Sequence, residues 1–159
     1  MSVEKVKEYL KDYGMADRVL VFDVSSATVD LAAQALGCEP GRIAKTMSFR
    51  IEDKVALIVA AGDEKIDNRK FKDHFHTKAK MLARDEVGAL TGNEAGGVCP
   101  FGVPEGVEIY LDESLRRFDP VYPAAGSDNS AVRITPDELE QVCHPVGWVD
   151  VCKLPEVTE

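Results

Sequence analysis

Two apolar runs, Ala44-Lys-Thr-Met-Ser-Phe-Arg-Ile51 and Val55-Ala-Leu-Ile-Val-Ala-Ala61, decide the fold that we expect for this chain. Both runs have the apolar and β-branched character that is typical of strands. The three residues between them, Glu52-Asp-Lys54, have the length and polarity of a hairpin connection. We therefore expect a β-hairpin here, and the other elements are placed around it.

Helices and further strands are expected on both sides of the hairpin. Amphipathic spacing and capping residues predict helices from the Ser2 cap to about Tyr13, and over 29–36, 67–76, 85–90, 113–118 and 135 onwards. Strands are expected over 18–23, 80–83, 107–111, 120–124, 130–134 and 147–151. Strict alternation of strand and helix is absent. Residues 1–159 are therefore expected to form a single α+β domain with a mostly antiparallel or mixed sheet.

The composition is that of a globular protein of the cytosol. The chain has 159 residues, 45% hydrophobic and 30% charged, enough for one core. No apolar run approaches the ~18 residues of a membrane helix, and the N-terminus lacks a signal sequence, so we expect cytoplasmic localisation and no membrane partner. The four cysteines are scattered, which favours free thiols; neither a metal site nor a cofactor is expected.

The charge distribution is uneven. The net charge is −9, whereas proteins that bind many phosphates are usually basic. Eleven of the 19 lysines and arginines nevertheless lie between Arg42 and Arg84. This segment is either a track for phosphates or a solvated helix face, and the sequence leaves both interpretations open.

Lys45 is the first candidate site residue. Strand alternation puts it on one face with Met47 and Phe49, and a lysine in that company is a local conflict of the kind that often marks function. Its ammonium could hold a phosphate or polarise a carbonyl. The alternative is that the side chain extends to solvent from the end of the strand.

The second candidate is the glycine-rich stretch Gly96-Gly97-Val98-Cys99-Pro100-Phe101-Gly102, within the irregular region 91–106. Glycines allow backbone N–H groups to approach a ligand, and successive N–H groups can bind an anion or stabilise an oxyanion. An ordinary tight turn is the alternative. A buried thiol is favoured for Cys99 over a nucleophile, because none of the three histidines has a diagnostic relation to it.

A third short motif, Ala125-Gly126-Ser127-Asp128-Asn129-Ser130, has the composition of a turn between two strands. Ser127 could donate a hydrogen bond to a ligand at the edge of a site. Taken together and in this order, Ile43-Ala-Lys45-Thr, Ala60-Ala-Gly62, the loop 96–102 and Ala125-Gly-Ser127 resemble the YbaK/prolyl-tRNA-synthetase-associated domain family. The resemblance covers about residues 18–142.

The resemblance implies a curved, partly barrel-like mixed sheet with surrounding helices. It also implies hydrolysis of the ester between a wrong, small amino acid such as alanine or cysteine and the 3′ end of tRNA, tRNA-Pro being the expected carrier. Lys45 would hold the phosphate or ribose of the terminal adenosine. Backbone N–H groups of Gly97, Val98 or Cys99 would stabilise the oxyanion. Gly96, Pro100, Phe101, Gly102, Gly126 and Ser127 would line the aminoacyl pocket.

Two features depart from the family pattern. Asp128-Asn129 replaces the basic residues that follow the third motif in many relatives, and the overall acidity favours a weak grip on tRNA. Prolyl-tRNA synthetase is therefore the expected protein partner, and a homodimer is left open. The competing hypothesis is a non-catalytic module that binds an aminoacyl-adenosine or nucleotide, or docks on a synthetase. A thiol-dependent enzyme that uses Cys99 is a more distant one.

Overall fold

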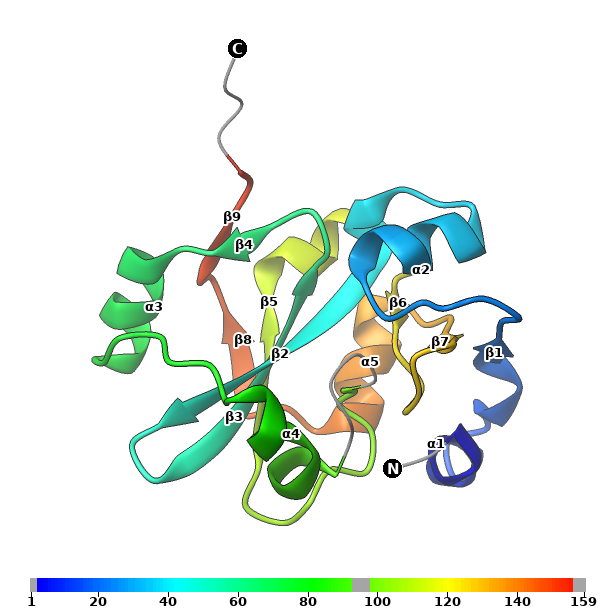
Figure 1. The fold of residues 1–159 in the computed structure, drawn as a ribbon, viewed down its shortest axis with the longest axis horizontal. Helices are drawn as coiled ribbons and strands as arrows, with labels where there is room; N and C mark the ends of the chain where they lie inside the picture. The colour runs from blue at the N-terminus through cyan, green and yellow to red at the C-terminus, as the bar shows by residue number, and fades with distance from the viewer. Residues whose placement is uncertain (1–2, 93–97, 156–159) are drawn as a thin grey trace.

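The expected hairpin lies at the centre of the fold, where β2 (Ile43–Ile51) pairs antiparallel with β3 (Lys54–Ala61) (Figure 1). In this computed structural model, residues 3–92 and 98–155 are described. Three more strands extend the pair into a curled mixed sheet of order β6-β2-β3-β5-β8. The pairs β2–β6, β3–β5 and β5–β8 are all parallel. The predicted α+β fold with a curved, partly barrel-like mixed sheet is confirmed.

The remaining elements surround this sheet. The α-helices of the described residues are α1 (Val3–Lys11), α2 (Val29–Leu36), α3 (Asn68–Phe75), α4 (Arg84–Thr91) and α5 (Pro136–Cys143). Short 3₁₀ helices are η1 (Ala16–Arg18), η2 (Pro40–Arg42) and η3 (Glu113–Arg117). The other strands are β1 (Val19–Val21), β4 (Lys65–Ile66), β5 (Glu108–Asp112), β6 (Tyr122–Pro123), β7 (Ser130–Val132), β8 (Gly147–Val149) and β9 (Cys152–Lys153). β1 pairs with β7 and β4 with β9, both antiparallel.

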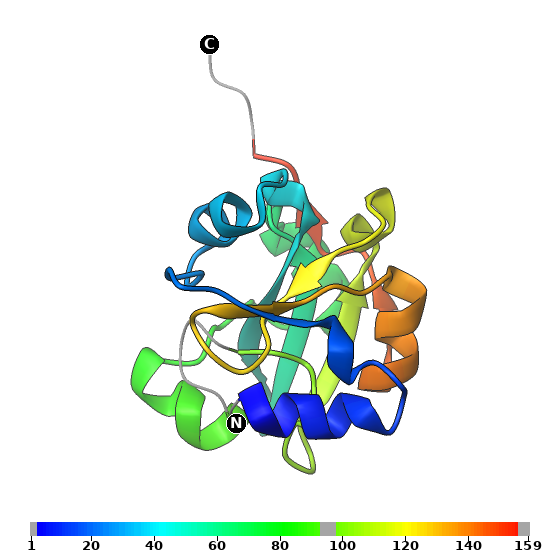
Figure 2. The same cartoon turned by 90° about the vertical axis from the view of Figure 1, so that its right-hand side faces the viewer.

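Strand β3 separates two hydrophobic cores. Leu57 and Val59 point into the larger core, which α1 and α5 cover, whereas Ile58 and Ala60 point into a smaller core under α3. All four residues are fully buried. This alternation follows from the two-residue period of a strand. Figure 2 shows α1 in front of the sheet and α5 at its right-hand side, and Figure 1 shows α3 at the end of the molecule opposite α1.

Local sequence signals explain where the helices begin and end. Thr28 caps α2 by accepting a hydrogen bond from the Leu31 N–H at 3.2 Å, and Gly37 ends the helix in the left-handed conformation with φ 68°. Asp67 caps α3 in the same way. Thr135 and Glu138 form a reciprocal capping box at the start of α5.

Several details differ from the sequence-based expectation. The expected strand over 80–83 is a single bridge between Met81 and Phe49, and the expected helix over 113–118 is the 3₁₀ helix η3. β4 and β9 were missed because two-residue strands carry no periodicity. Ser2, the expected cap of α1, lies outside the described residues.

An ion pair joins the end of η1, directly before β1, to α5. Both Arg18 guanidinium NH groups donate to the Glu138 carboxylate at 2.9 Å. This pair, aided by the Thr135 N–H, lowers the pKa of Glu138 to about 2. Because the folded pKa is depressed, the stabilisation is present above the ordinary value of 4.5 and disappears as the pH falls towards 2.

We predict that Glu138→Gln lowers the melting temperature at pH 7, and that the difference from the wild type closes between pH 4.5 and pH 2. Thermal unfolding monitored by circular dichroism across this range measures it. Glu105→Gln is the matched control, because Glu105 is an exposed loop residue. A difference that persists unchanged at pH 2 would contradict the assignment to this ion pair.

Candidate functional site

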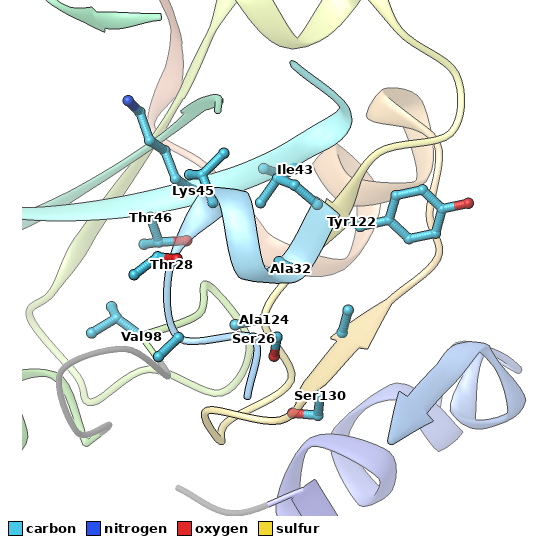
Figure 3. A pocket seen from close by; sticks show the side chains of 14 residues that line it. Ser26, Thr28, Ala32, Ile43, Lys45, Thr46, Val98, Tyr122, Ala124 and Ser130 are labelled. Atoms are coloured by element: carbon cyan, nitrogen blue, oxygen red, sulfur yellow. The ribbon is translucent and has the colours of Figure 1, made fainter. Parts of the chain in front are cut away.

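A pocket of about 190 Å³ lies on one side of β2 (Figure 3). Segments from distant parts of the chain form it: the loop before α2 and α2 itself, the start of β2, the described end of the glycine-rich loop, and the β6–β7 region. The residues that line it are Ser26, Ala27, Thr28, Val29, Ala32, Ile43, Ala44, Lys45, Thr46, Val98, Tyr122, Ala124, Ser130 and Ala131. Most of them are small, so the pocket suits a small group.

The pocket borders a gap in the pairing of β2. On its outer edge, Ile43 and Ala44 pair with β6. Further along, the Leu82 N–H donates to the Ser48 carbonyl at 3.0 Å, and the Arg50 N–H donates to the Lys80 carbonyl at 2.9 Å. Between these contacts, the described residues place no strand against the edge at 45–47. An unpaired strand edge leaves backbone polar groups available to a ligand.

The Lys45 ammonium does not point into this pocket. Figure 3 shows its side chain directed away from Thr46 and Val98, which lie on the other side of the strand. The ammonium donates a hydrogen bond to the Glu64 carbonyl. Burial lowers the pKa of Lys45, and the nearby Cys152 and Asp63 oppose this shift. The Lys45 ammonium and Val98 therefore lie on opposite sides of β2. The predicted contact of Lys45 with substrate stays a prediction.

The glycine-rich loop is only partly described. Gly96 and Gly97, two of the predicted site residues, lie outside the described residues. Val98 lines the pocket. Cys99 and Phe101 are fully buried in the larger core, where the Phe101 ring lies 6.5 Å from that of Tyr9. In the described part of the loop, Val98 therefore lies at the pocket, and the side chains of Cys99 and Phe101 anchor the loop in the larger core.

The remaining loop residues have structural positions. Pro100 is buried, and Gly102 is exposed with φ 64°, the left-handed conformation that glycine adopts without strain. Neither lines the pocket among the described residues. The burial of the Cys99 side chain fits the favoured interpretation as a packed thiol. Catalytic or binding roles for these residues stay predictions.

The third motif forms the expected turn between β6 and β7. Gly126 has φ 88°, and the Ser127 hydroxyl donates to the Asn129 side-chain oxygen at 2.8 Å. Ser127 also lies 2.6 Å from the Ser130 hydroxyl. The pocket is lined by Ser130 rather than by Gly126 or Ser127. Within the described residues, Ser127 reaches the pocket only through Ser130, which the sequence reasoning did not single out.

Two other pocket hydroxyls were also missed. The side-chain oxygens of Ser26 and Thr46 are buried and have no hydrogen-bond partner among the described residues. Thr46 follows Lys45 in the sequence, so alternation places it on the opposite face of β2. That alternation was the available signal for Thr46. No comparable sequence signal pointed to Ser26, because an irregular loop brings this residue to the pocket.

Among the described residues that line the pocket, only Lys45 and Tyr122 have ionisable side chains. None of the described residues that line it is His, Cys, Asp or Glu. In the described part of the chain, no three such side chains gather as they would around a metal ion. No helix in residues 3–92 and 98–155 is long and apolar enough to cross a membrane. Apart from the Lys45 ammonium, which points away, and the Tyr122 phenol, the described lining offers hydrogen bonding by hydroxyls and backbone groups.

Comparison with known proteins gives concordant matches. The model of the aminoacyl-tRNA editing domain matches residues 24–142. "Uncharacterized protein YwhH" from Bacillus subtilis is 50% identical over 154 residues, covering 96% of this chain and 98% of the relative. A protein of Enterococcus faecalis described as "Putative Cys-tRNA(Pro)/Cys-tRNA(Cys) deacylase EbsC" is 27% identical over 140 residues, covering 86% of this chain and 82% of the relative.

A solved structure supports the same relationship. The crystal structure of "a putative trans-editing enzyme for prolyl tRNA synthetase" superposes with a TM-score of 0.85 and 30% sequence identity. The superposition covers 95% of this chain and 96% of that one. The likeness therefore extends over both cores and the elements around the pocket.

Gly62, at the end of β3, supports one wall of the pocket. A Cβ there would lie 2.5 Å from the Pro40 carbonyl oxygen and 2.7 Å from a methyl carbon of Val29, which lines the pocket. Gly62→Ala should therefore displace the start of α2 and destabilise the fold by about 1–3 kcal/mol. Chemical unfolding measures this cost. Gly147→Ala is the control, because a Cβ there meets no atom within 4 Å; equal costs for both variants would contradict the proposed close packing.

Proposed function

The chain belongs to the aminoacyl-tRNA editing domain family, and on that premise we propose that it hydrolyses the ester between a wrongly attached amino acid and the 3′ end of tRNA. The favoured substrates carry a small side chain such as that of alanine or cysteine, and tRNA-Pro is the favoured carrier. The protein acts in trans, on tRNA that a synthetase has already released.

The observation that carries the proposal is the pocket beside β2. Its volume of about 190 Å³, between walls that include Ala32, Ala44, Ala124 and Ala131, is enough to admit a small side chain. Exclusion by size is limited, because one methylene changes discrimination by only ~1–3 kcal/mol. A second hydrolytic site is useful for this reason wherever a synthetase cannot reject a small competitor by binding alone.

The proposed reaction relies on hydrogen bonding rather than on a side-chain base. A water oxygen adds to the ester carbonyl, the bond to the ribose oxygen breaks, and that oxygen takes a proton. The products are the free amino acid and the tRNA hydroxyl. Backbone N–H groups of Val98 and its neighbours in the glycine-rich loop stabilise the developing oxyanion. The neighbouring ribose hydroxyl of the substrate orients the water. With a cysteinyl ester, the thiol can instead attack its own carbonyl; the bond to the ribose oxygen then breaks, that oxygen takes the thiol proton, and water opens the released thiolactone to free cysteine.

Lys45 anchors the phosphate or ribose of the terminal adenosine in this proposal. Its ammonium must then give up its hydrogen bond to the Glu64 carbonyl and bind the substrate instead. The flexible four-carbon stem of lysine permits such a change of direction. Desolvation already lowers the pKa of Lys45, so a phosphate that neutralises the charge would be favourable.

The first test is deacylation of a panel of mischarged tRNAs, with alanyl- and cysteinyl-tRNA-Pro included. We expect at least one small amino acid to be released well above the rate in buffer. Proline should be released more slowly from prolyl-tRNA-Pro. Release no faster than in buffer across the whole panel would refute the proposed activity. Adding prolyl-tRNA synthetase tests the partner, since a weakly binding acidic protein should turn over faster in its presence.

The second test concerns Lys45. We expect Lys45→Ala to lower kcat/KM at least tenfold on the best tRNA substrate while the melting temperature changes little. Lys45→Arg should retain more activity because it keeps the charge, and Lys54→Ala is the control for an exposed lysine of the same hairpin. Full activity of Lys45→Ala, or lost stability with an unchanged rate, would assign Lys45 a structural role.

A second candidate function is a binding module without catalysis. The absence of His, Cys, Asp and Glu among the described pocket residues favours it. Such a module would bind a stable 3′-aminoacyl-adenosine analogue without releasing amino acid from any tRNA of the panel. The deacylation assay and a binding titration with the analogue therefore distinguish the two functions.

A further inference from the structure

The serine and threonine hydroxyls of the pocket differ in their hydrogen bonding. Four of them line its described part. Thr28 accepts a hydrogen bond from the Leu31 N–H, and Ser130 pairs with Ser127. In the described part of the chain, the Ser26 and Thr46 hydroxyls have no partner, although both oxygens are buried. A buried hydroxyl without a partner is destabilising, so each is expected to find one when the pocket fills.

The two unpartnered hydroxyls are held by backbone. The Ser26 N–H donates to the Asp128 carbonyl at 2.6 Å, which fixes the loop before α2 against the β6–β7 turn. Ser26 is only 9% exposed. Thr46 lies within the β2–β3 ladder opposite Val59. Figure 3 shows Ser26 and Thr46 on the side of β2 where Val98 lies. Two hydroxyls held in this way are preorganised to bind a polar group.

The lining indicates which part of the substrate meets them. An aminoacyl ester carries an α-ammonium, and burying that charge requires a carboxylate or several acceptors. No described residue of the lining is acidic, and we therefore assign the ammonium to the mouth of the pocket, in water, as part of the inference. The group that enters among the alanines is therefore the neutral side chain. A hydroxyl on that side chain can both donate to and accept from the two protein hydroxyls.

We propose that Ser26 and Thr46 are specificity residues that hydrogen-bond a hydroxyl-bearing side chain, so that a seryl ester is the preferred substrate of this pocket. The inference rests on the proposed function and narrows its substrate class. It orders the small amino acids by hydrogen-bonding capacity: serine first, cysteine second because a thiol bonds weakly, and alanine last.

The test compares side chains of equal size. Serine and 2-aminobutyrate differ by a hydroxyl in place of a methyl group, so their esters on the same tRNA separate hydrogen bonding from volume. We expect kcat/KM for the seryl ester to exceed that for the 2-aminobutyryl ester at least tenfold, the factor that about 1.4 kcal/mol supplies. Ser26→Ala and Thr46→Val should bring this ratio towards one, and Thr46→Ser should preserve it.

Two controls keep the test decisive. Ser25→Ala removes the neighbouring hydroxyl, which accepts from the Ala27 N–H and does not line the pocket, and should leave the ratio unchanged. Thr46→Val should melt at or above the wild-type temperature, because it removes a hydroxyl that has no partner in the free protein. A clearly lower melting temperature would mean that the hydroxyl already has a partner, which overturns the inference.

The outcomes separate the inference from the proposed function. Equal rates for the seryl and 2-aminobutyryl esters, or an unchanged ratio in both pocket variants, would overturn the specificity role while hydrolysis itself stands. No hydrolysis of any ester would refute the proposed function, and the inference with it. A high seryl preference that collapses in Ser26→Ala and Thr46→Val supports both.

Discussion

The burial of β3 on both faces is the constraint on which the rest of the structure depends. Leu57 to Ala61 are fully buried, with alternate side chains in two different cores. A strand in this position needs a neighbour on each edge and a layer on each face. β2 and β5 fill the edges. α1 and α5 cover one face and α3 the other, so helices from both ends of the chain converge on this strand.

The same two-sided burial divides the functional residues. β2 shares the pleat of β3, so neighbouring residues along it belong to different environments. Lys45 lies opposite Ala60, on the face of the smaller core, and its ammonium binds the Glu64 carbonyl. Thr46 lies opposite Val59 and faces the pocket. The adjacent residues Lys45 and Thr46 therefore place a charged group on one face of β2 and a hydroxyl without a described partner on the other.

The pocket suits discrimination better than it suits acid–base chemistry. Its described walls offer small apolar side chains and hydroxyls, with no carboxylate, imidazole or thiol. In the proposed reaction, the substrate would supply part of the chemistry, and the protein would position the correct group and reject the others. The buried, unpartnered Ser26 and Thr46 fit that division, because an unfilled hydrogen bond penalises a ligand that lacks the matching group.

The sequence by itself determined the hairpin, the bounds of α2 and the turn at Gly126, because periodicity and turn composition are local properties. It also supplied the order of motifs that resembles the editing family. Only the tertiary structure decided that Ser26, Thr46 and Ser130 meet in one pocket and that the Lys45 ammonium points away from it. These relations join residues up to a hundred positions apart. They depend on how the sheet curls and how the loops pack, which no local pattern records.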